Sequence, residues 1–281
     1  MTPEARSVVV ESDGLDIRAV VWGRDADPTV VLVHGNGAHA HWWEPLVPSL
    51  VPGWRAVAID LRGHGESGWP ATPAYAMPDF ERDLAAVIAA TVSGPFALVG
   101  HSMGGRVALW YATRRPAGIT ALGMLDSRLD PLVAADAARY RKKMSAREGR
   151  GYPTREAAIA AFRFVPEEPD APAELVTRLA DRAVVERGPG DWTFRFDRGV
   201  LDVAGDGAGD MMLLLPRIAV PAFVANGRDS WVLDATRRAR MVDGLPRGEG
   251  REFPGAHHFL VSHAPEVGAA LRRFLDTATG R

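Results

Sequence analysis

The chain has 281 residues, of which 47% are hydrophobic and 24% charged, and its formal net charge is -2. This length suffices for one large domain or two small ones, and the near-neutral charge gives no electrostatic case for a nucleic acid or an anionic membrane as partner. There is no cysteine, which excludes disulfides, thiolate metal ligands and a cysteine nucleophile. Because neither a signal peptide nor an apolar run of about 18 residues is found, we expect a cytoplasmic protein without a transmembrane helix.

The predicted elements begin with an antiparallel hairpin, in which the strands 7–11 and 17–22 are joined by a turn at Asp13-Gly14. Short apolar runs typical of buried parallel strands follow, and helical patterns separate most of them. The runs cover residues 30–33, 56–59, 96–99, 121–125 and 222–225, and helices are predicted over 79–90, 103–113 and 265–277. This alternation predicts an α/β fold with a mostly parallel sheet covered on both faces.

One segment interrupts this alternation. Residues 127–216 have helical patterning, many prolines and no clear buried strand. A structureless loop of that length is improbable in a compact protein, so we interpret the segment as an inserted helical lid. The predicted organisation is therefore a core of residues 1–126 and 217–281 that carries a lid of residues 127–216.

The most informative motif lies where the apolar run 96–99 ends, at Gly100-His101-Ser102-Met103-Gly104-Gly105. A Gly-x-Ser-x-Gly turn between a strand and a helix exposes the serine hydroxyl, and the next backbone N–H points toward an oxyanion formed by its attack.

A nucleophilic serine needs a general base to take its proton, and the base needs an acid to orient it. His257 and His258 follow a predicted strand before the last helix, while Asp126 and Asp229 each follow a strand, so all four are candidates at one sheet edge.

At this point the chain resembles the α/β-hydrolase fold superfamily, in its lidded esterase-like branch. The resemblance covers essentially the whole length and lies in separate motifs: His34-Gly35-Asn36-Gly37, the loop 60–67 (Asp-Leu-Arg-Gly-His-Gly-Glu-Ser), the serine turn, Asn226-Gly227-Arg228-Asp229, and Gly255-Ala256-His257-His258-Phe259. The order serine, acid, histidine is the order that this fold uses. The resemblance implies an eight-stranded, mostly parallel sheet with helices on both faces.

The resemblance also implies roles for residues. Ser102 is expected to be the nucleophile, His258 the base and Asp229 the acid, although His257 occupies a position where the family usually has glycine and some members place their acid where Asp126 lies. Backbone N–H groups of Asn36 and Met103 are expected to form the oxyanion hole. Residues of a possible substrate pocket are Gly35, Gly37, Trp42, Trp43, His101, Trp231 and Phe259. No cofactor and no metal site are implied.

The function predicted from these residues is that of a serine hydrolase that cleaves a carboxylic ester of an apolar small molecule through an acyl-enzyme. Hydrolysis of a carbon–carbon bond or a lactone is an alternative, because the same triad serves those reactions. Alternatives of another class are a cofactor-free oxygenase or lyase, in which the serine only binds substrate, and a ligand-binding member of the fold.

Overall fold

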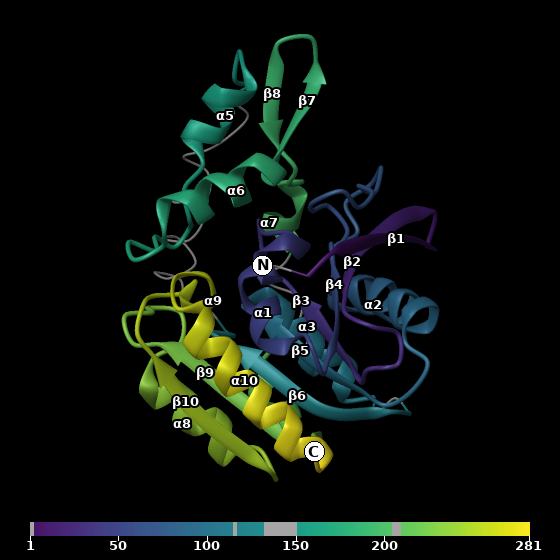
Figure 1. Ribbon diagram of the computed structural model, residues 1–281, viewed down its shortest axis with the longest axis vertical. Coiled ribbons are helices and arrows are strands. Elements are labelled where there is room, and N and C mark those ends of the chain that lie inside the picture. Colours follow the sequence, from purple (N-terminus) through teal and green to yellow (C-terminus); the bar gives the residue numbers. More distant parts are fainter. Residues whose placement is uncertain (1–2, 115–116, 132–150, 204–208) are drawn as a thin grey trace.

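The computed structural model describes residues 3–114, 117–131, 151–203 and 209–281. Its central feature is an eight-stranded sheet of order β1-β2-β4-β3-β5-β6-β9-β10 (Figure 1). The strands are β1 (Ala5–Ser12), β2 (Leu15–Trp22), β3 (Thr29–Val33), β4 (Arg55–Ile59), β5 (Phe96–His101), β6 (Ile119–Leu125), β9 (Ala222–Gly227) and β10 (Gly248–Phe253). The first two form the predicted antiparallel hairpin, and β2 also pairs antiparallel with β4, while the pairs from β4 to β10 are parallel.

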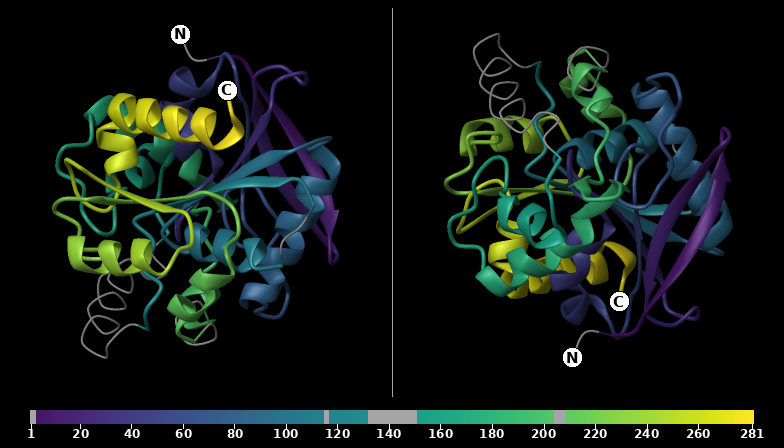
Figure 2. Two further views of the ribbon diagram at one scale, coloured as in Figure 1. Left: turned by 90° about the horizontal axis from the view of Figure 1, so that it is seen from below. Right: turned by 90° about the horizontal axis from the view of Figure 1, so that it is seen from above.

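The central strands are buried on both faces because their sequences are continuously apolar. Every residue of β3, β4 and β5 is buried, as expected for parallel strands covered by helices on either side. One face packs against η1 (Ala40–Leu46), α1 (Val47–Leu50), α9 (Phe259–Ser262) and α10 (Ala264–Thr279). The other packs against α2 (Met77–Thr91), α3 (Met103–Ala112) and α8 (Ala235–Asp243), and Figure 2 shows these two layers of helices on either side of the sheet.

Amphipathic spacing explains how the helices cover the sheet. In α2 the side chains of Phe80, Leu84 and Val87 are fully buried, and their spacing places them on one face of the helix. In α10 the same spacing buries Val267, Leu271 and Leu275. The helices and the parallel sheet predicted from periodicity are therefore confirmed.

The segment between β6 and β9 contains α5 (Arg155–Ala161), α6 (Ala173–Ala183), the hairpin β7 (Val184–Gly188) and β8 (Asp191–Phe194), α7 (Gly199–Val203) and η2 (Met211–Arg217). Figure 1 shows α5, α6 and the hairpin together at one end of the molecule. The hairpin is a feature that the sequence pattern did not predict, because its strands are half-buried or exposed rather than continuously apolar. Residues 132–150 and 204–208 of the expected lid lie outside the described residues.

The carboxyl ends of the parallel strands carry the motifs found in the sequence. The loop 34–38 follows β3, the serine turn follows β5, Asp126 follows β6 and the two histidines follow β10. Since parallel strands end at the same edge of a sheet, this topology brings residues more than 150 positions apart into one region. No helix in the described part of the chain is long and apolar enough to cross a membrane.

Candidate active site

Ser102 occupies a turn that depends on its glycine neighbours. Its backbone has φ 53° and ψ −120°, a strained conformation for a residue with a side chain. A Cβ on Gly100 would lie 2.2 Å from the carbonyl oxygen of Gly104, and a Cβ on Gly104 would lie 2.1 Å from that of Val33. The strand, the turn and α3 are thus packed backbone against backbone, and the serine hydroxyl is held where α3 begins.

A chain of hydrogen bonds links Ser102 to a histidine and an aspartate. His257 Nε2 lies 3.0 Å from Ser102 Oγ, and His257 Nδ1 lies 2.9 Å from Asp126 Oδ1. Asp126 directly follows β6, and its N–H donates to the carbonyl oxygen of Ala225 at 2.7 Å, which fixes it beside the end of β9. The imidazole therefore lies between a hydroxyl and a carboxylate, as a general base requires.

The Asp126 carboxylate is fully buried and receives two further hydrogen bonds. The Gly227 N–H donates to Oδ2 at 2.9 Å, and the Ser230 hydroxyl donates to Oδ1 at 2.7 Å. Burial raises the pKa of Asp126, while these donors favour its ionised form. Burial also lowers the pKa of His257, so the imidazole tends to be neutral and able to accept a proton.

The structure corrects the expected histidine and acid. The imidazole that reaches Ser102 belongs to His257, whereas the His258 ring packs among aromatic rings, with centroids 5.0 Å from Trp42 and 5.1 Å from Phe164. The two histidines follow a turn at Gly255, where φ is +92°.

The acid differs from the expected one for a similar reason. Asp229 is exposed, and the loop after β9 presents Ser230 instead to the carboxylate of Asp126. The histidine loop follows β10, and it reaches across the end of β9 so that His257 Nδ1 lies 2.9 Å from Asp126 Oδ1, directly after β6. Asp126, the alternative acid of the sequence analysis, is the carboxylate that bonds Nδ1 of the His257 imidazole.

The loop 34–38 packs against the serine turn and places Asn36 beside it. A Cβ on Gly35 would lie 3.0 Å from Ser102 Cβ, so only glycine permits this contact. His34 supports the loop: its Nδ1 lies 2.7 Å from the Gly35 carbonyl oxygen, and its Nε2 accepts from the Leu61 N–H at 3.0 Å. Burial lowers the pKa of His34 to about 4, which keeps the ring neutral. The N–H of Met103, in the first turn of α3, has no acceptor within the helix.

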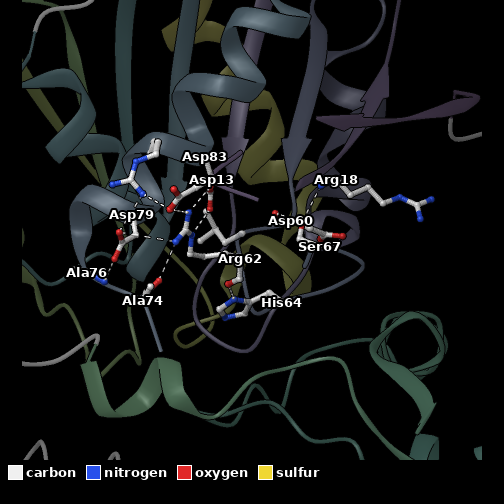
Figure 3. A network of polar contacts seen from close by, with 12 residues as sticks. Asp13, Arg18, Asp60, Arg62, His64, Ser67, Ala74, Ala76, Asp79 and Asp83 are labelled. Carbon is white, nitrogen blue, oxygen red and sulfur yellow. Dashed lines mark hydrogen bonds and ion pairs between the residues drawn. The ribbon is translucent and has the colours of Figure 1, made fainter. Parts of the chain in front are cut away.

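A buried polar network beneath this loop holds it in place (Figure 3). Asp60 accepts from the N–H groups of Ala40 at 2.6 Å and Glu66 at 2.9 Å. Arg62 forms two hydrogen bonds to Asp83, at 2.7 and 2.8 Å, and both side chains are almost completely buried. None of these hydrogen bonds involves Ser102, and they fix the loop after β4 and the start of η1.

A cavity of about 260 Å³ opens beside the loop 34–38, a size suited to a small molecule. The core contributes six residues to its lining, Asn36, Gly37, Ala38, His39, Trp42 and Trp69. The segment between β6 and β9 contributes the remainder, which are Phe162, Arg163, Val165, Ala183, Arg187, Thr193, Phe194, Arg195, Phe196, Asp197 and Arg198.

Two of the expected pocket residues, Gly37 and Trp42, line this cavity, and the others lie elsewhere in the described structure. Trp43 is fully buried in the core, and Phe259 stacks on Phe253 with ring centroids 5.3 Å apart. His101 is buried behind the serine turn, where its Nε2 bonds the His257 carbonyl oxygen at 2.9 Å. Gly35 faces the serine turn, and Trp231 is half-buried in the loop after β9.

Three histidines lie close enough together to be considered as metal ligands, although no metal site was expected from the sequence. Ring nitrogens of His101, His257 and His258 lie within 4.8 Å of one another. Both ring nitrogens of His257 already bond Ser102 and Asp126, and Nε2 of His101 bonds the His257 carbonyl oxygen. A metal ion here would have to displace the serine–histidine bond, so the arrangement favours proton transfer over metal binding.

The arrangement of these loops matches a known family. The family model of the alpha/beta hydrolase fold matches residues 28–265 of this chain. The chain belongs to the alpha/beta hydrolase fold family. It is an enzyme of this family, since its relatives include proteins named as esterases and hydrolases.

Individual relatives cover most of the chain. It is 34% identical over 273 residues to the pimeloyl-(acyl-carrier protein) methyl ester esterase of Neisseria meningitidis, covering 90% of this chain and 95% of that protein. It is 30% identical over 275 residues to the non-heme chloroperoxidase of Streptomyces lividans, covering 92% and 95%. A solved structure of E-2-(acetamidomethylene)succinate hydrolase superposes on this chain with a TM-score of 0.84 at 21% identity. The superposition covers 97% of this chain and all of that one, and it shows that the two share a fold.

Glu168 is a residue of this hydrolase site that no sequence motif indicated. It lies between α5 and α6, and its largely buried carboxylate accepts from the Ala256 N–H at 3.0 Å, the His258 N–H at 2.8 Å and the Ser262 hydroxyl at 2.8 Å. These donors flank His257 on both sides. Glu168 therefore ties the segment between β6 and β9 to the histidine loop of this enzyme.

We expect the Glu168→Gln substitution to lower the free energy of unfolding by about 2–4 kcal/mol, because a buried N–H group then faces an amide NH₂ instead of a carboxylate oxygen. Urea denaturation measures this change. Asp170→Asn, a charge-removing substitution at an exposed position two residues away, is the control and should leave the free energy of unfolding unchanged. A loss below about 0.5 kcal/mol for Glu168→Gln would contradict the structural role given to Glu168.

Proposed function

We propose that this enzyme is a serine hydrolase that cleaves carboxylic esters of small molecules through an acyl-enzyme. The observation that carries this proposal is the hydrogen-bonded chain from Ser102 through His257 to Asp126. In this proposal Ser102 is the nucleophile, His257 the general base and Asp126 the acid that orients it.

The first half of the reaction acylates the serine. His257 Nε2 takes the proton of Ser102 Oγ while the oxygen attacks the ester carbonyl carbon. The carbonyl oxygen becomes an oxyanion, which the N–H groups of Asn36 and Met103 stabilise by hydrogen bonds, each donor contributing about 3 kcal/mol. His257 then gives its proton to the leaving alcohol, and the acyl group stays on Ser102.

The second half releases the acid. A water molecule gives a proton to His257 Nε2 and attacks the acyl carbon, and His257 returns that proton to Ser102 as the carboxylic acid leaves. Throughout the cycle the Asp126 carboxylate accepts a hydrogen bond from His257 Nδ1–H and stays ionised. It thereby fixes the tautomer that exposes Nε2 and stabilises the imidazolium.

The cavity beside Asn36 supports the choice of a small-molecule ester. Aromatic rings form part of its walls, with Trp42 and Trp69 on the core side and Phe162, Phe194 and Phe196 from the segment between β6 and β9. We propose that this segment, residues 127–216, acts as a lid that forms the substrate-binding wall. The relative named as a methyl ester esterase supports an ester as the bond that is cleaved.

A fluorophosphonate probe tests for the activated serine. We expect the native protein to be labelled at Ser102, detected by peptide mass spectrometry, and to hydrolyse p-nitrophenyl acetate. The Ser102→Ala variant should show neither labelling nor hydrolysis above about 10⁻⁴ of the native rate, because the covalent step is lost. Heat-denatured protein is the control for nonspecific labelling. Absence of labelling in folded native protein would favour a serine that only binds substrate.

The choice of acid is tested by a matched pair of substitutions. Asp126→Asn should lower kcat by about 10⁴-fold, because the amide cannot hold the imidazole in the required tautomer. Asp229→Asn removes a carboxylate from the same sheet edge but from an exposed position, and should change kcat less than twofold. Equal losses in the two variants, or a larger loss at Asp229, would overturn the assignment of Asp126.

The pH dependence of kcat/KM follows from the lowered pKa of His257. Only the neutral imidazole accepts the serine proton, and burial lowers the pKa of His257 from its ordinary value of 6.5. On acidification the kcat/KM for p-nitrophenyl acetate should therefore remain on its plateau through pH 6.5 and fall only at lower pH. Circular dichroism over the same range controls for unfolding. An acid limb centred above pH 6.5 would contradict this environment for His257.

A further inference from the structure

The substrate cavity carries more positive charge than an apolar ester needs. Four arginines line it, Arg163, Arg187, Arg195 and Arg198, against a single acidic residue, Asp197. The Asp197 carboxylate already accepts two hydrogen bonds. Its Oδ2 accepts from the hydroxyl of Tyr75, and its Oδ1 accepts from the Gly199 N–H at 2.9 Å. The cavity therefore has a net positive lining, which favours a negatively charged ligand.

Arg195 is the arginine whose surroundings point most directly to a ligand. Its N–H donates to the Ala183 carbonyl oxygen at 2.7 Å, and its own carbonyl oxygen accepts from the Gly65 N–H at 3.0 Å, so its backbone is fixed from two sides. Its Nε donates to the Val184 carbonyl oxygen at 3.2 Å. This bond anchors the base of the guanidinium, and the side chain remains half-buried at the cavity wall.

Among the described residues no carboxylate lies within ion-pair distance of Arg195, and the buried carboxylate of Asp60 attracts its charge only through space. Arg187, which lines the same cavity, pairs with Asp191 at 3.0 Å and is largely neutralised. A half-buried guanidinium without an ion pair at contact distance has lost part of its hydration, and burial lowers the pKa of Arg195 more than the attraction of Asp60 raises it. A carboxylate that enters the cavity would supply the missing partner.

We propose that Arg195 binds a carboxylate on the substrate, so that the preferred substrates are half-esters of dicarboxylic acids. This inference rests on the proposed function, because it takes the ester carbonyl to lie at Ser102. Arg195 and Asn36, which follows the glycine packed on Ser102, both line the cavity, and in this proposal one molecule spans from the serine turn to Arg195. Its aromatic walls at Phe194 and Phe196 would contact the methylene groups between the two ends.

Matched pairs of esters test the proposal. The mono-p-nitrophenyl esters of glutaric and adipic acid carry a carboxylate at neutral pH, and p-nitrophenyl pentanoate and hexanoate are neutral esters of similar length. We expect the kcat/KM of the native enzyme to be about 10- to 100-fold higher for the anionic member of each pair, mainly through KM. In Arg195→Gln this ratio should fall to about 1. In Arg195→Lys it should be intermediate, because lysine keeps the positive charge but lacks the planar guanidinium that forms two hydrogen bonds to a carboxylate.

Arg178→Gln is the control, because it removes one positive charge from an exposed position on α6, outside the cavity. It should keep the full ratio. Equal kcat/KM values for the two members of each pair in the native enzyme, or an unchanged ratio in both Arg195 variants, would overturn the proposal while leaving ester hydrolysis intact.

Direct binding separates this proposal from the proposed function. If the native enzyme hydrolysed no ester, the proposed function would fail, but the anion site would still be measured by titrating monomethyl adipate into Ser102→Ala by calorimetry. Binding that is at least 10-fold weaker in the Ser102→Ala, Arg195→Gln double variant supports the site. Equal binding by the two proteins, or binding by neither, overturns it.

Discussion

The close approach of backbone to backbone around Ser102 is the constraint on which the rest of the site depends. Gly100 and Gly104 allow β5, the turn and α3 to touch, and Gly35 allows the next loop to rest against the serine itself. The Ser102 N–H donates to the Leu125 carbonyl oxygen at 2.9 Å, so the same turn also fixes the end of β6. Asp126 is the next residue. A shift at the turn would therefore move Ser102, the loop 34–38 and Asp126 together.

The fold and the turn that carries Ser102 could be predicted because their patterns are local. A buried parallel strand is a short apolar run, and an amphipathic helix has a fixed spacing, so sequence alone locates both. The turn at Ser102 is equally local, since its glycines are required by contacts within a few residues and by one neighbouring strand. The hairpin β7–β8 escaped prediction because its half-buried residues carry no such pattern.

The histidine and the acid could not be chosen from sequence because the choice depends on directions in space. His257 and His258 are adjacent, and only the path of the folded loop shows that the His257 ring points toward Ser102. Asp126 and Asp229 both follow strands at the same edge, and the bond from Ser230 to Asp126 shows which carboxylate faces inward. Glu168 lies about ninety residues before the loop that it binds, and no local pattern records such a contact.

The contact of Glu168 with the histidine loop bears on how this enzyme could evolve or be redesigned. Inserted segments in this fold are often regarded as interchangeable modules that alter specificity while the core keeps its chemistry. Here the segment also supplies a carboxylate to the backbone on either side of His257. A chimaera that received another insertion would lose this support unless an acid returned at the same point. Under the proposed function, replacing this segment changes the substrate-binding wall and the support of His257 together, so recombination between relatives is constrained to exchange both.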